Sequence, residues 1–201
     1  MIELLVATRN AHKIREIQHI LGPDFTLSDL QACTDIPNIP ETGTSFDENA
    51  KLKALAASAH LGALVIADDS GLEVDALGGA PGIYSARYAG PDATDRHKIN
   101  KLLRELARVR CKEHRRRARF RCVLALAHAG NLLGTFEGTV EGRIANEVRG
   151  DSGFGYDPIF IPEGFEQTFG ELPGEVKNAI SHRAKAIRAL ADRLRQLDLG
   201  G

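Results

Sequence analysis

Two short apolar runs, each ended by polar residues, restrict the fold more than any other feature of the chain. Residues 2–7 form one nearly continuous apolar run, and residues 63–67 form a second. An unbroken apolar run of this length is typical of a strand buried on both faces, which occurs in sheets covered by helices. The sequence therefore predicts an α/β fold.

Apolar residues at helical spacing predict helices within residues 14–21, 46–61, 99–109 and 184–194. Ser45 and Glu48 fit a capping box at the start of the second helix, and Gly62 is its expected C-cap. The second apolar run is expected to end at Asp68, with residues 72–74 forming a separate strand beside it.

A hairpin is expected from residues 120–127 and 132–140 around Gly130-Asn131, and a last strand at residues 159–161. Strand–helix units together with a hairpin predict a mixed sheet flanked by helices. The length of 201 residues, without repeats or a linker, suits one domain over residues 1–201.

The charge balance excludes some classes of protein. The chain has 26 Lys+Arg and 27 Asp+Glu, a formal charge of −1, whereas proteins that coat nucleic acid or membrane surfaces carry a large basic excess. The three cysteines show no C-x-x-C spacing, and no apolar run approaches the roughly 20 residues of a membrane span. We expect a cytoplasmic protein.

The basic segment 108–121 lacks interleaved aromatic residues and is interpreted as a solvated helix end and strand entry.

One candidate phosphate site lies between the first strand and the first helix, in the segment Thr8-Arg9-Asn10-Ala11-His12-Lys13. Free amides and the positive end of the helix dipole favour an anion there, and Lys13 is one turn into the helix. The alternative is a plain N-cap followed by a solvated lysine. The sequence contains no P-loop or Rossmann fingerprint.

A candidate metal site lies at Asp68-Asp69-Ser70-Gly71. Adjacent carboxylates repel each other and need a cation or strong donors, and oxygen ligands of this kind suit Mg²⁺. Strand alternation sends the two side chains to opposite faces, so only one is expected inside a site. Glu41 is a possible further carboxylate from a loop. The alternative is that both aspartates cap a turn.

Two further segments carry candidate ligand-binding groups. In residues 153–158, two glycines between Phe154 and Tyr156 allow a flat ligand to approach the backbone, and the alternative is a tight turn with Phe154 in the core. Lys177, His182 and Arg183 place donor groups around a helix start, although a charge cluster alone is more often solvated surface.

Together and in this order, these segments resemble the inosine triphosphate pyrophosphatase family, especially its bacterial members. The resemblance runs from residue 3 to about residue 190. It rests on Thr8-x-Asn10-x-x-Lys13, Ser45-Phe46-x-Glu48-Asn49-Ala50, Ala67-Asp68-Asp69-Ser70-Gly71-Leu72, residues 78–88, residues 153–158 and Ser181-His182-Arg183.

The resemblance implies Mg²⁺-dependent hydrolysis of non-standard purine nucleoside triphosphates (ITP, dITP and XTP) to the monophosphate and pyrophosphate. This activity cleanses the nucleotide pool and keeps such nucleotides out of DNA and RNA. The resemblance also implies two lobes around a central nucleotide-binding cleft and a homodimer. From the charge balance we expect no nucleic-acid or membrane partner.

The resemblance also implies roles for individual residues. Asp69 is the expected proton acceptor that activates water, and Asp69 and Glu41 are the expected metal ligands. The expected substrate-binding residues are Thr8, Arg9, Asn10, Ala11, His12, Lys13, Lys53, Ser70, Phe154, Gly155, Tyr156, Asp157, Lys177, His182 and Arg183. The N-terminal group and Lys53 are assigned to the triphosphate, and residues 154–157, Lys177, His182 and Arg183 to the base.

Two alternatives stay open at this point. One is a pyrophosphatase of the Maf type, which shares an opening of this kind but lacks the motif at 153–158 and the Ser-His-Arg segment. The other is a nucleotide- or nucleic-acid-binding module without turnover, which would rest on the basic segment 108–121.

Overall fold

The structure is a computed structural model that describes residues 2–30 and 39–196 of the chain. It divides into two compact units, each built from separate chain segments. Unit 1 takes the described residues up to Asp69, Cys122–Gly138 and those from His182 onward, and unit 2 takes Ser70–Arg121 and Thr139–Ser181. Cys33 lies outside the described residues.

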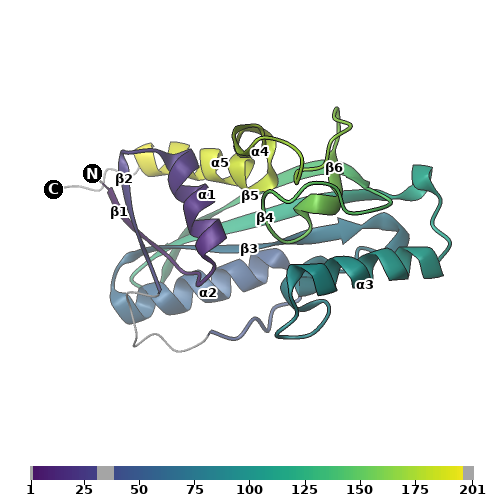
Figure 1. Cartoon of the computed structure of the whole chain (residues 1–201). Coiled ribbons are helices and arrows are strands. Elements are labelled where there is room, and N and C mark those ends of the chain that lie inside the picture. Colours follow the sequence, from purple (N-terminus) through teal and green to yellow (C-terminus); the bar gives the residue numbers. More distant parts are fainter. Residues whose placement is uncertain (1, 31–38, 197–201) are drawn as a thin grey trace. The chain divides into compact units, whose positions relative to one another are not determined.

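Six strands form one sheet in the order β2-β1-β3-β4-β5-β6 (Figure 1). Their bounds are β1 Ile2–Val6, β2 Phe25–Asp29, β3 Leu64–Val74, β4 Arg117–His128, β5 Asn131–Ile144 and β6 Phe160–Pro162. β1 is parallel to β2 and to β3, whereas β5 and β6 are antiparallel. The predicted mixed sheet is therefore confirmed.

Five α-helices flank the strands: α1 Ala11–Leu21, α2 Phe46–Leu61, α3 Asp95–Arg108, α4 Gly174–Ile180 and α5 His182–Gln196. Four of them correspond to the helices predicted from periodicity. The short helix α4 was not predicted, because seven residues are too few to show a helical period. None of the helices in the described part of the chain is long and apolar enough to cross a membrane.

The core of unit 1 joins α1 and α5 to the strands. Leu4 of β1, Ile17 of α1 and Leu190 of α5 belong to one buried apolar cluster. The start of α5 lies directly against β5 at Gly138, where an added Cβ would be 2.0 Å from the carbonyl oxygen of His182. This close approach fixes the N-terminal end of α5, which carries two of the candidate site residues.

The core of unit 2 is built around aromatic rings. Phe120, Phe160 and Phe169 pack together, with ring centroids 4.6 Å apart for Phe120 and Phe160 and 5.5 Å apart for Phe160 and Phe169. Leu102 and Leu106 of α3 belong to the same buried cluster. Tyr156, from the loop of residues 153–158, belongs to this cluster as well.

The strand prediction needs one correction, at Asp68 and Asp69. β3 does not end there but continues to Val74, so the two aspartates lie in the middle of a strand. The physical reason is that side chains from other elements hold both carboxylates, as described below. The interpretation in which both aspartates cap a turn is therefore wrong.

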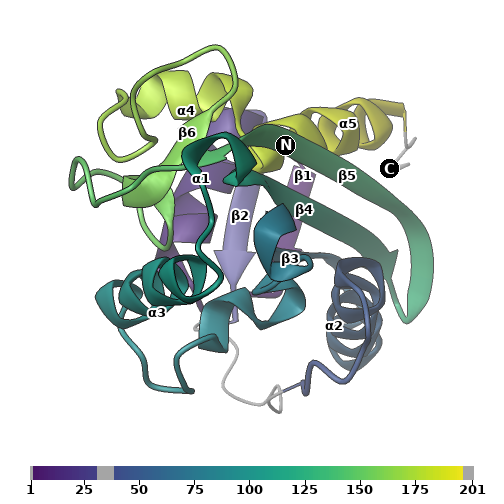
Figure 2. The ribbon, with the colours of Figure 1, turned by 90° about the vertical axis from the view of Figure 1, so that its right-hand side faces the viewer.

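Two predicted turns and caps differ in detail. Ser45 caps α2 as predicted, since its Oγ accepts from the Glu48 amide at 3.1 Å, but the Glu48 carboxylate accepts from the Thr44 amide rather than that of Ser45. The predicted hairpin is formed by β4 and β5, which Figure 2 shows side by side. Its turn lies at Ala129-Gly130, where both residues have positive φ, instead of Gly130-Asn131.

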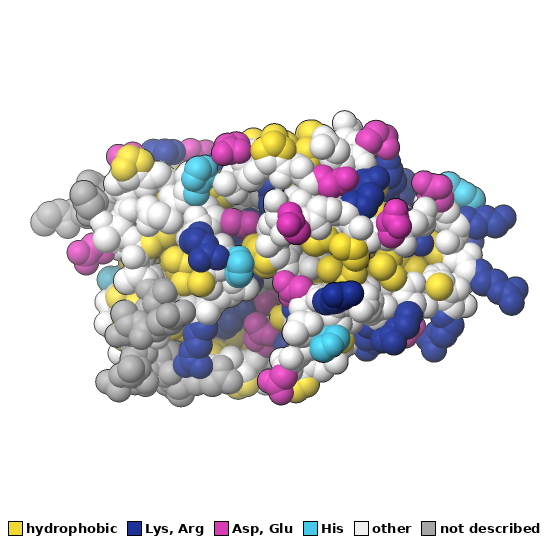
Figure 3. Space-filling view, in the orientation of Figure 1, with side chains coloured by type: hydrophobic (Ala, Val, Ile, Leu, Met, Phe, Trp, Pro, Cys, Tyr) yellow, Lys and Arg dark blue, Asp and Glu magenta, His cyan; other side chains and the backbone are white. Residues whose placement is uncertain are grey.

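The basic segment contains the end of α3 and the start of β4, as predicted. Figure 3 shows dark blue Lys and Arg side chains gathered over these elements. Most of these side chains are exposed, whereas Arg116 is buried and donates to the carbonyl oxygens of Ile144 and Ala145 at 2.8 and 2.7 Å. The interpretation as a solvated helix end and strand entry is confirmed apart from Arg116.

Candidate active site

The buried carboxylate of Asp68 joins three elements of unit 1. Its Oδ2 accepts a hydrogen bond from Arg183 Nε of α5 at 2.7 Å, and its Oδ1 accepts from Lys13 Nζ of α1. Arg183 Nη1 also forms an ion pair with Glu16 of α1. Asp68 is 2% exposed and Arg183 is 1% exposed. Four charged groups, two positive and two negative, therefore form one buried network, called here the Asp68 network.

The electrostatics of the Asp68 network keep Asp68 and Arg183 charged. Burial alone would raise the pKa of Asp68, but the charges and hydrogen bonds of Arg183 and Lys13 hold that pKa well below its ordinary value. Burial likewise would lower the pKa of Arg183, and the charges of Asp68 and Glu16 raise it instead. The four formal charges sum to zero, which removes much of the cost of burying them.

A second cluster in unit 1 gathers around Lys53 of α2. Lys53 Nζ donates to Glu41 Oε1 and to Asp69 Oδ1, both at 2.9 Å, and to the Asp68 carbonyl oxygen at 2.8 Å. Although burial would lower the pKa of Lys53, Asp69 and Glu41 raise it. Burial raises the pKa of Asp69 in spite of the opposing charge of Lys53. One cation here faces two carboxylates, which leaves a formal charge of −1.

The second carboxylate oxygen of Asp69 indicates where the negatively charged cluster around Lys53 can bind a water or an ion. Asp69 is 6% exposed, and its Oδ2 has no hydrogen-bond partner among the described residues. A buried carboxylate oxygen without a partner is costly and marks a place for a water or an ion. Asp68 has both oxygens bonded, whereas Asp69 has one oxygen without a partner among the described residues. That only one of the two aspartates lies inside a site stays a prediction.

The residues fit a magnesium ion. Mg²⁺ is commonly held by one or two carboxylates, with waters and substrate phosphates completing its octahedron. Asp69 and Glu41 supply two carboxylates, both of which accept from Lys53 Nζ. Such a pair leaves the remaining positions of the ion to waters and substrate phosphates.

The N-terminus of α1 is capped by Asn10, as the plain-cap alternative predicted. Asn10 Oδ1 accepts from the amides of His12 at 2.9 Å and Lys13 at 3.4 Å, while Thr8 Oγ1 accepts from the Asn10 amide at 3.2 Å. Arg9, Asn10 and His12 are exposed. The solvated-lysine part of that alternative is wrong, because Lys13 Nζ is paired with Asp68 and its side chain is only 16% exposed.

In unit 2, Asp157 organises the loop of residues 153–158. Its Oδ2 accepts from the Phe154 amide at 2.8 Å and from Lys177 Nζ of α4 at 2.6 Å. Gly153 has a φ of +79°, and a Cβ there would lie 2.1 Å from the same carboxylate oxygen. Lys177 Nζ also lies 4.5 Å from the centroid of the Phe154 ring. A ring, a cation and a carboxylate are thus held together.

The two aromatic residues of this loop have different surroundings. Phe154 is half-buried, so the alternative that places it in the core is wrong. Tyr156 is the buried one, at 4% exposure, and its hydroxyl donates to the Ser85 carbonyl oxygen at 3.0 Å. Burial raises the pKa of Tyr156. Tyr156 therefore supports the loop, whereas Phe154 is the more exposed of the two rings.

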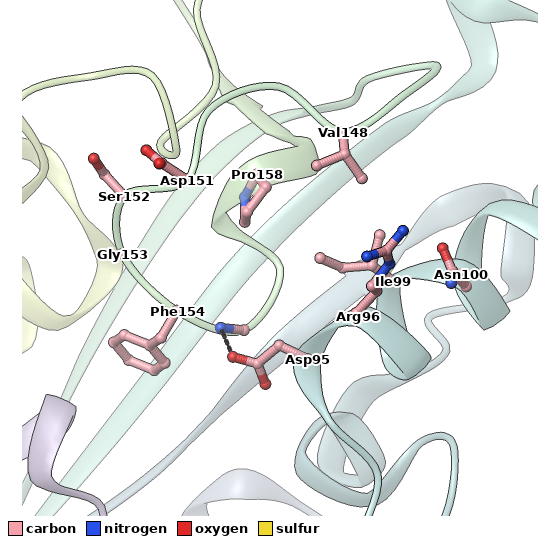
Figure 4. A pocket seen from close by; sticks show the side chains of 11 residues that line it. Asp95, Arg96, Ile99, Asn100, Val148, Asp151, Ser152, Gly153, Phe154 and Pro158 are labelled. Carbon is pink, nitrogen blue, oxygen red and sulfur yellow. Dashed lines mark hydrogen bonds between the residues drawn. The ribbon is translucent and has the colours of Figure 1, made fainter.

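A cavity of about 510 Å³ lies beside this loop in unit 2 (Figure 4). Its lining includes Phe154 from the loop, Val148 from the preceding segment, and Asp95 and Arg96 from the start of α3. Asp95 Oδ2 accepts from the Gly155 amide at 2.6 Å, the bond drawn in Figure 4. No motif in the sequence pointed to α3 as a neighbour of this loop.

Lys177, His182 and Arg183 are buried, with exposures of 5%, 4% and 1%. The expectation that such a charge cluster is solvated surface is therefore wrong, because Asp157 and Asp68 provide buried partners for Lys177 and Arg183. Ser70, the next residue of β3 after Asp69, is half-buried.

The structure brings Lys13 and Arg183 together at Asp68, and Glu41 and Asp69 together at Lys53. In unit 2 it brings Phe154 and Lys177 together at Asp157. Sequence reasoning missed Glu16. The only sequence signal for it is its position three residues after Lys13, which places both on one face of α1.

Known proteins match this chain over nearly its whole length. A model of the Ham1 family matches residues 4–193. The chain is 48% identical over 199 residues to a dITP/XTP pyrophosphatase of Bacillus licheniformis, covering 98% of this chain and 100% of that protein. It is 49% identical over 195 residues to a dITP/XTP pyrophosphatase of Geobacter sulfurreducens, covering 96% and 97%.

Structural comparison agrees with the sequence comparison. The solved structure of a HAM1 protein from Coxiella burnetii matches with a TM-score of 0.88 and 41% sequence identity, covering 98% of this chain and 100% of that protein. The chain therefore belongs to the Ham1 family, which confirms the resemblance carried by its motifs.

Proposed function

We propose that this protein hydrolyses non-standard purine nucleoside triphosphates, ITP, dITP and XTP, to the monophosphate and pyrophosphate with the help of Mg²⁺. Membership of the Ham1 family and the names of the similar pyrophosphatases support this. The observation that carries the proposal is the buried Oδ2 of Asp69, which has no hydrogen-bond partner in the described part of the chain. Two further charged groups, Lys53 and Glu41, lie beside this carboxylate.

In this proposal Asp69 takes a proton from the water that attacks the α-phosphorus. Lys53 holds Asp69 Oδ1, so Oδ2 is the atom that acts on the water. Asp69 and Glu41 would hold Mg²⁺, which supplies positive charge to the phosphates and lowers the pKa of a bound water. The protein contributes mainly positioning and electrostatics, as is usual for phosphoryl transfer.

The triphosphate is assigned to unit 1. Thr8, Asn10 and Lys13 stand at the start of α1, and Lys53 adds a second ammonium. Arg9, Ala11 and His12 line the same helix start, where backbone amides and the helix dipole favour phosphate. The cations match the negative charge that builds on the departing pyrophosphate.

In unit 2, the base is assigned to Phe154 for stacking, with Lys177 and Asp157 as polar groups. His182 and Arg183 of unit 1 are assigned to the base by the family resemblance alone. Hypoxanthine and xanthine carry an acceptor oxygen at position 6, whereas adenine carries a donor amino group there. A buried donor of the protein is left unpaired by adenine, at a cost of about 1–3 kcal/mol. This cost disfavours ATP as a substrate.

A substrate panel tests the proposal. The purified protein is incubated with Mg²⁺ and ITP, XTP, dITP, ATP, GTP or TTP separately, and the products are identified. We expect monophosphate and pyrophosphate from ITP, dITP and XTP, with ATP and GTP largely spared. Diphosphate and phosphate as products would move the cleavage site away from the α-phosphorus, and turnover of TTP alone would favour the Maf-type alternative.

We also propose that residues 1–201 act as one pyrophosphatase domain, as a homodimer in the cytoplasm. The family resemblance supports the dimer, the chain length without repeats or a linker supports the single domain, and the cysteine spacing supports the cytoplasm. Light scattering on the purified protein over a range of concentrations tests the dimer, for which we expect about twice the chain mass of 21.8 kDa.

A further inference from the structure

Arg183 is the most deeply buried large side chain of the candidate site, and two of its nitrogens face carboxylates. Its side chain is 2% exposed. Nε donates to Asp68 of β3, and Nη1 pairs with Glu16 of α1. A guanidinium presents its N–H groups in a rigid planar fork, so these two carboxylates fix both its position and its orientation.

Asp68 connects Arg183 to Lys13. The two carboxylate oxygens are divided between them, with Oδ2 toward Arg183 Nε at 2.7 Å and Oδ1 toward Lys13 Nζ. Asp68 is in the middle of a strand and fully buried, so it forms a rigid anchor for the flexible lysine side chain. The place of the Lys13 ammonium therefore depends on a carboxylate that Arg183 holds.

The charges of the Asp68 network indicate how Arg183 affects the binding of an anion. With Arg183 present, Lys13 and Arg183 balance Asp68 and Glu16, and the network is neutral. Without the charge of Arg183, the network keeps the carboxylates of Asp68 and Glu16 and the ammonium of Lys13, so its formal charge is −1. A negative network draws Lys13 inward and repels a triphosphate, since charges interact strongly where water is excluded.

We propose that Arg183 is a positioning residue for the triphosphate: it balances the charges of Asp68 and Glu16, so that Asp68 holds the Lys13 ammonium in place for phosphate within a network that has no net negative charge. This differs from the base-binding role that the resemblance implies for Arg183. The inference rests on the proposed function only in taking a triphosphate as the ligand of Lys13.

The test uses inorganic tripolyphosphate, which has no base. Its affinity for the full-length protein is measured by calorimetry in the presence of Mg²⁺, for the wild type, Arg183→Gln and Arg183→Lys. We expect Arg183→Gln to weaken binding about tenfold or more and Arg183→Lys to weaken it less, because lysine keeps the charge and loses the fork. An unchanged affinity in Arg183→Gln would overturn the proposal.

Glu16→Gln is the matched control of opposite charge. It removes a carboxylate from the same network and leaves one excess positive charge, so tripolyphosphate should bind at least as tightly as to the wild type. A role of Arg183 as scaffold alone predicts a loss in both variants. Equal losses in Glu16→Gln and Arg183→Gln would therefore overturn the proposal. If Arg183→Gln does not fold, Arg183→Lys and Glu16→Gln still give opposite expectations.

Selectivity separates phosphate positioning from base recognition. The ratio of kcat/KM for ITP to that for ATP should stay within about twofold of the wild-type value in Arg183→Lys, while both individual values fall. A collapse of that ratio would return Arg183 to the base. A wild type that binds tripolyphosphate and hydrolyses no nucleotide would refute the proposed function and leave the positioning role standing. A wild type that does not bind tripolyphosphate refutes the positioning role.

Discussion

Lys53 donates a hydrogen bond of 2.9 Å to one oxygen of Asp69 and leaves the other oxygen, Oδ2, buried and without a partner in the described part of the chain. The lysine thus decides which atom of the carboxylate is available for chemistry. It also opposes the effect of burial on Asp69, whose pKa is nevertheless raised. A base that is fixed on one side and open on the other suits the activation of a water.

The first prediction concerns Asp69→Asn. The amide keeps the size of the side chain and cannot accept the proton, so kcat for ITP should fall at least about 100-fold, the lower end of the contribution of a general base. Circular dichroism and the thermal midpoint check that the fold is kept. Turnover close to that of the wild type would remove Asp69 from the mechanism.

The second prediction concerns the ring of Phe154. Stacking of a base on an aromatic side chain is worth about 1–3 kcal/mol, so Phe154→Leu should raise KM for ITP roughly 5- to 150-fold. Phe154→Tyr keeps the ring and is the matched control, with a KM near that of the wild type. Tripolyphosphate affinity should not change in either variant. Equal KM values for Phe154→Leu and the wild type would mean that the base does not stack there.

The fold could be predicted from local patterns, and the site only in part. Helix α5 and strand β1 could be predicted because the spacing of their apolar residues is a local pattern, set by residues that are close in the sequence. The continuation of β3 through Asp68 could not be predicted, because the groups that neutralise Asp68 are Lys13 and Arg183, which are 55 and 115 residues away in the chain. Charged residues in a sequence look exposed until their partners are known.

The same limit applies to the aromatic loop. The sequence showed that Phe154 and Tyr156 flank a glycine, but a turn has no regular side-chain period that would predict which of the two rings is buried. The hydrogen bond from Tyr156 to the Ser85 carbonyl oxygen, 71 residues away in the chain, decides it. Sequence patterns thus located the functional segments, while long-range contacts assigned the roles within them.

The third prediction concerns Cys122 and pH. Its thiol is buried, and burial together with the nearby charge of Asp68 raises its pKa well above the ordinary value. The other groups of the network that face it are Lys13 and Arg183, which lower its pKa less. In the unfolded chain the thiol ionises above about pH 8.5. The unfolded state therefore releases this proton first, and the folded state loses stability as pH rises further.

Cys122→Ala isolates this effect. The difference in unfolding free energy between wild type and Cys122→Ala should be constant below about pH 8 and should then shift against the wild type by at most about 1.4 kcal/mol per pH unit. Denaturant unfolding at pH 7, 8, 9 and 10 measures it. A constant difference over the whole range would show that the thiol ionises equally in both states.

The last prediction concerns the contact of β5 with the start of α5. A Cβ at Gly138 would lie 2.0 Å from the His182 carbonyl oxygen and 2.7 Å from the Ala186 amide nitrogen, both backbone atoms that cannot rotate away. Gly138→Ala should therefore shift α5 and destabilise the protein by about 1–3 kcal/mol, the usual cost of overpacking. Because α5 carries Arg183, the tripolyphosphate affinity should fall as well. Gly174→Ala is the control, since its Cβ meets nothing within 4 Å, and alanine is the better helix former at that position in α4. Thermal unfolding of both variants, beside that of the wild type, decides whether this backbone contact holds α5 in place, and equal midpoints for Gly138→Ala and Gly174→Ala would show that it does not.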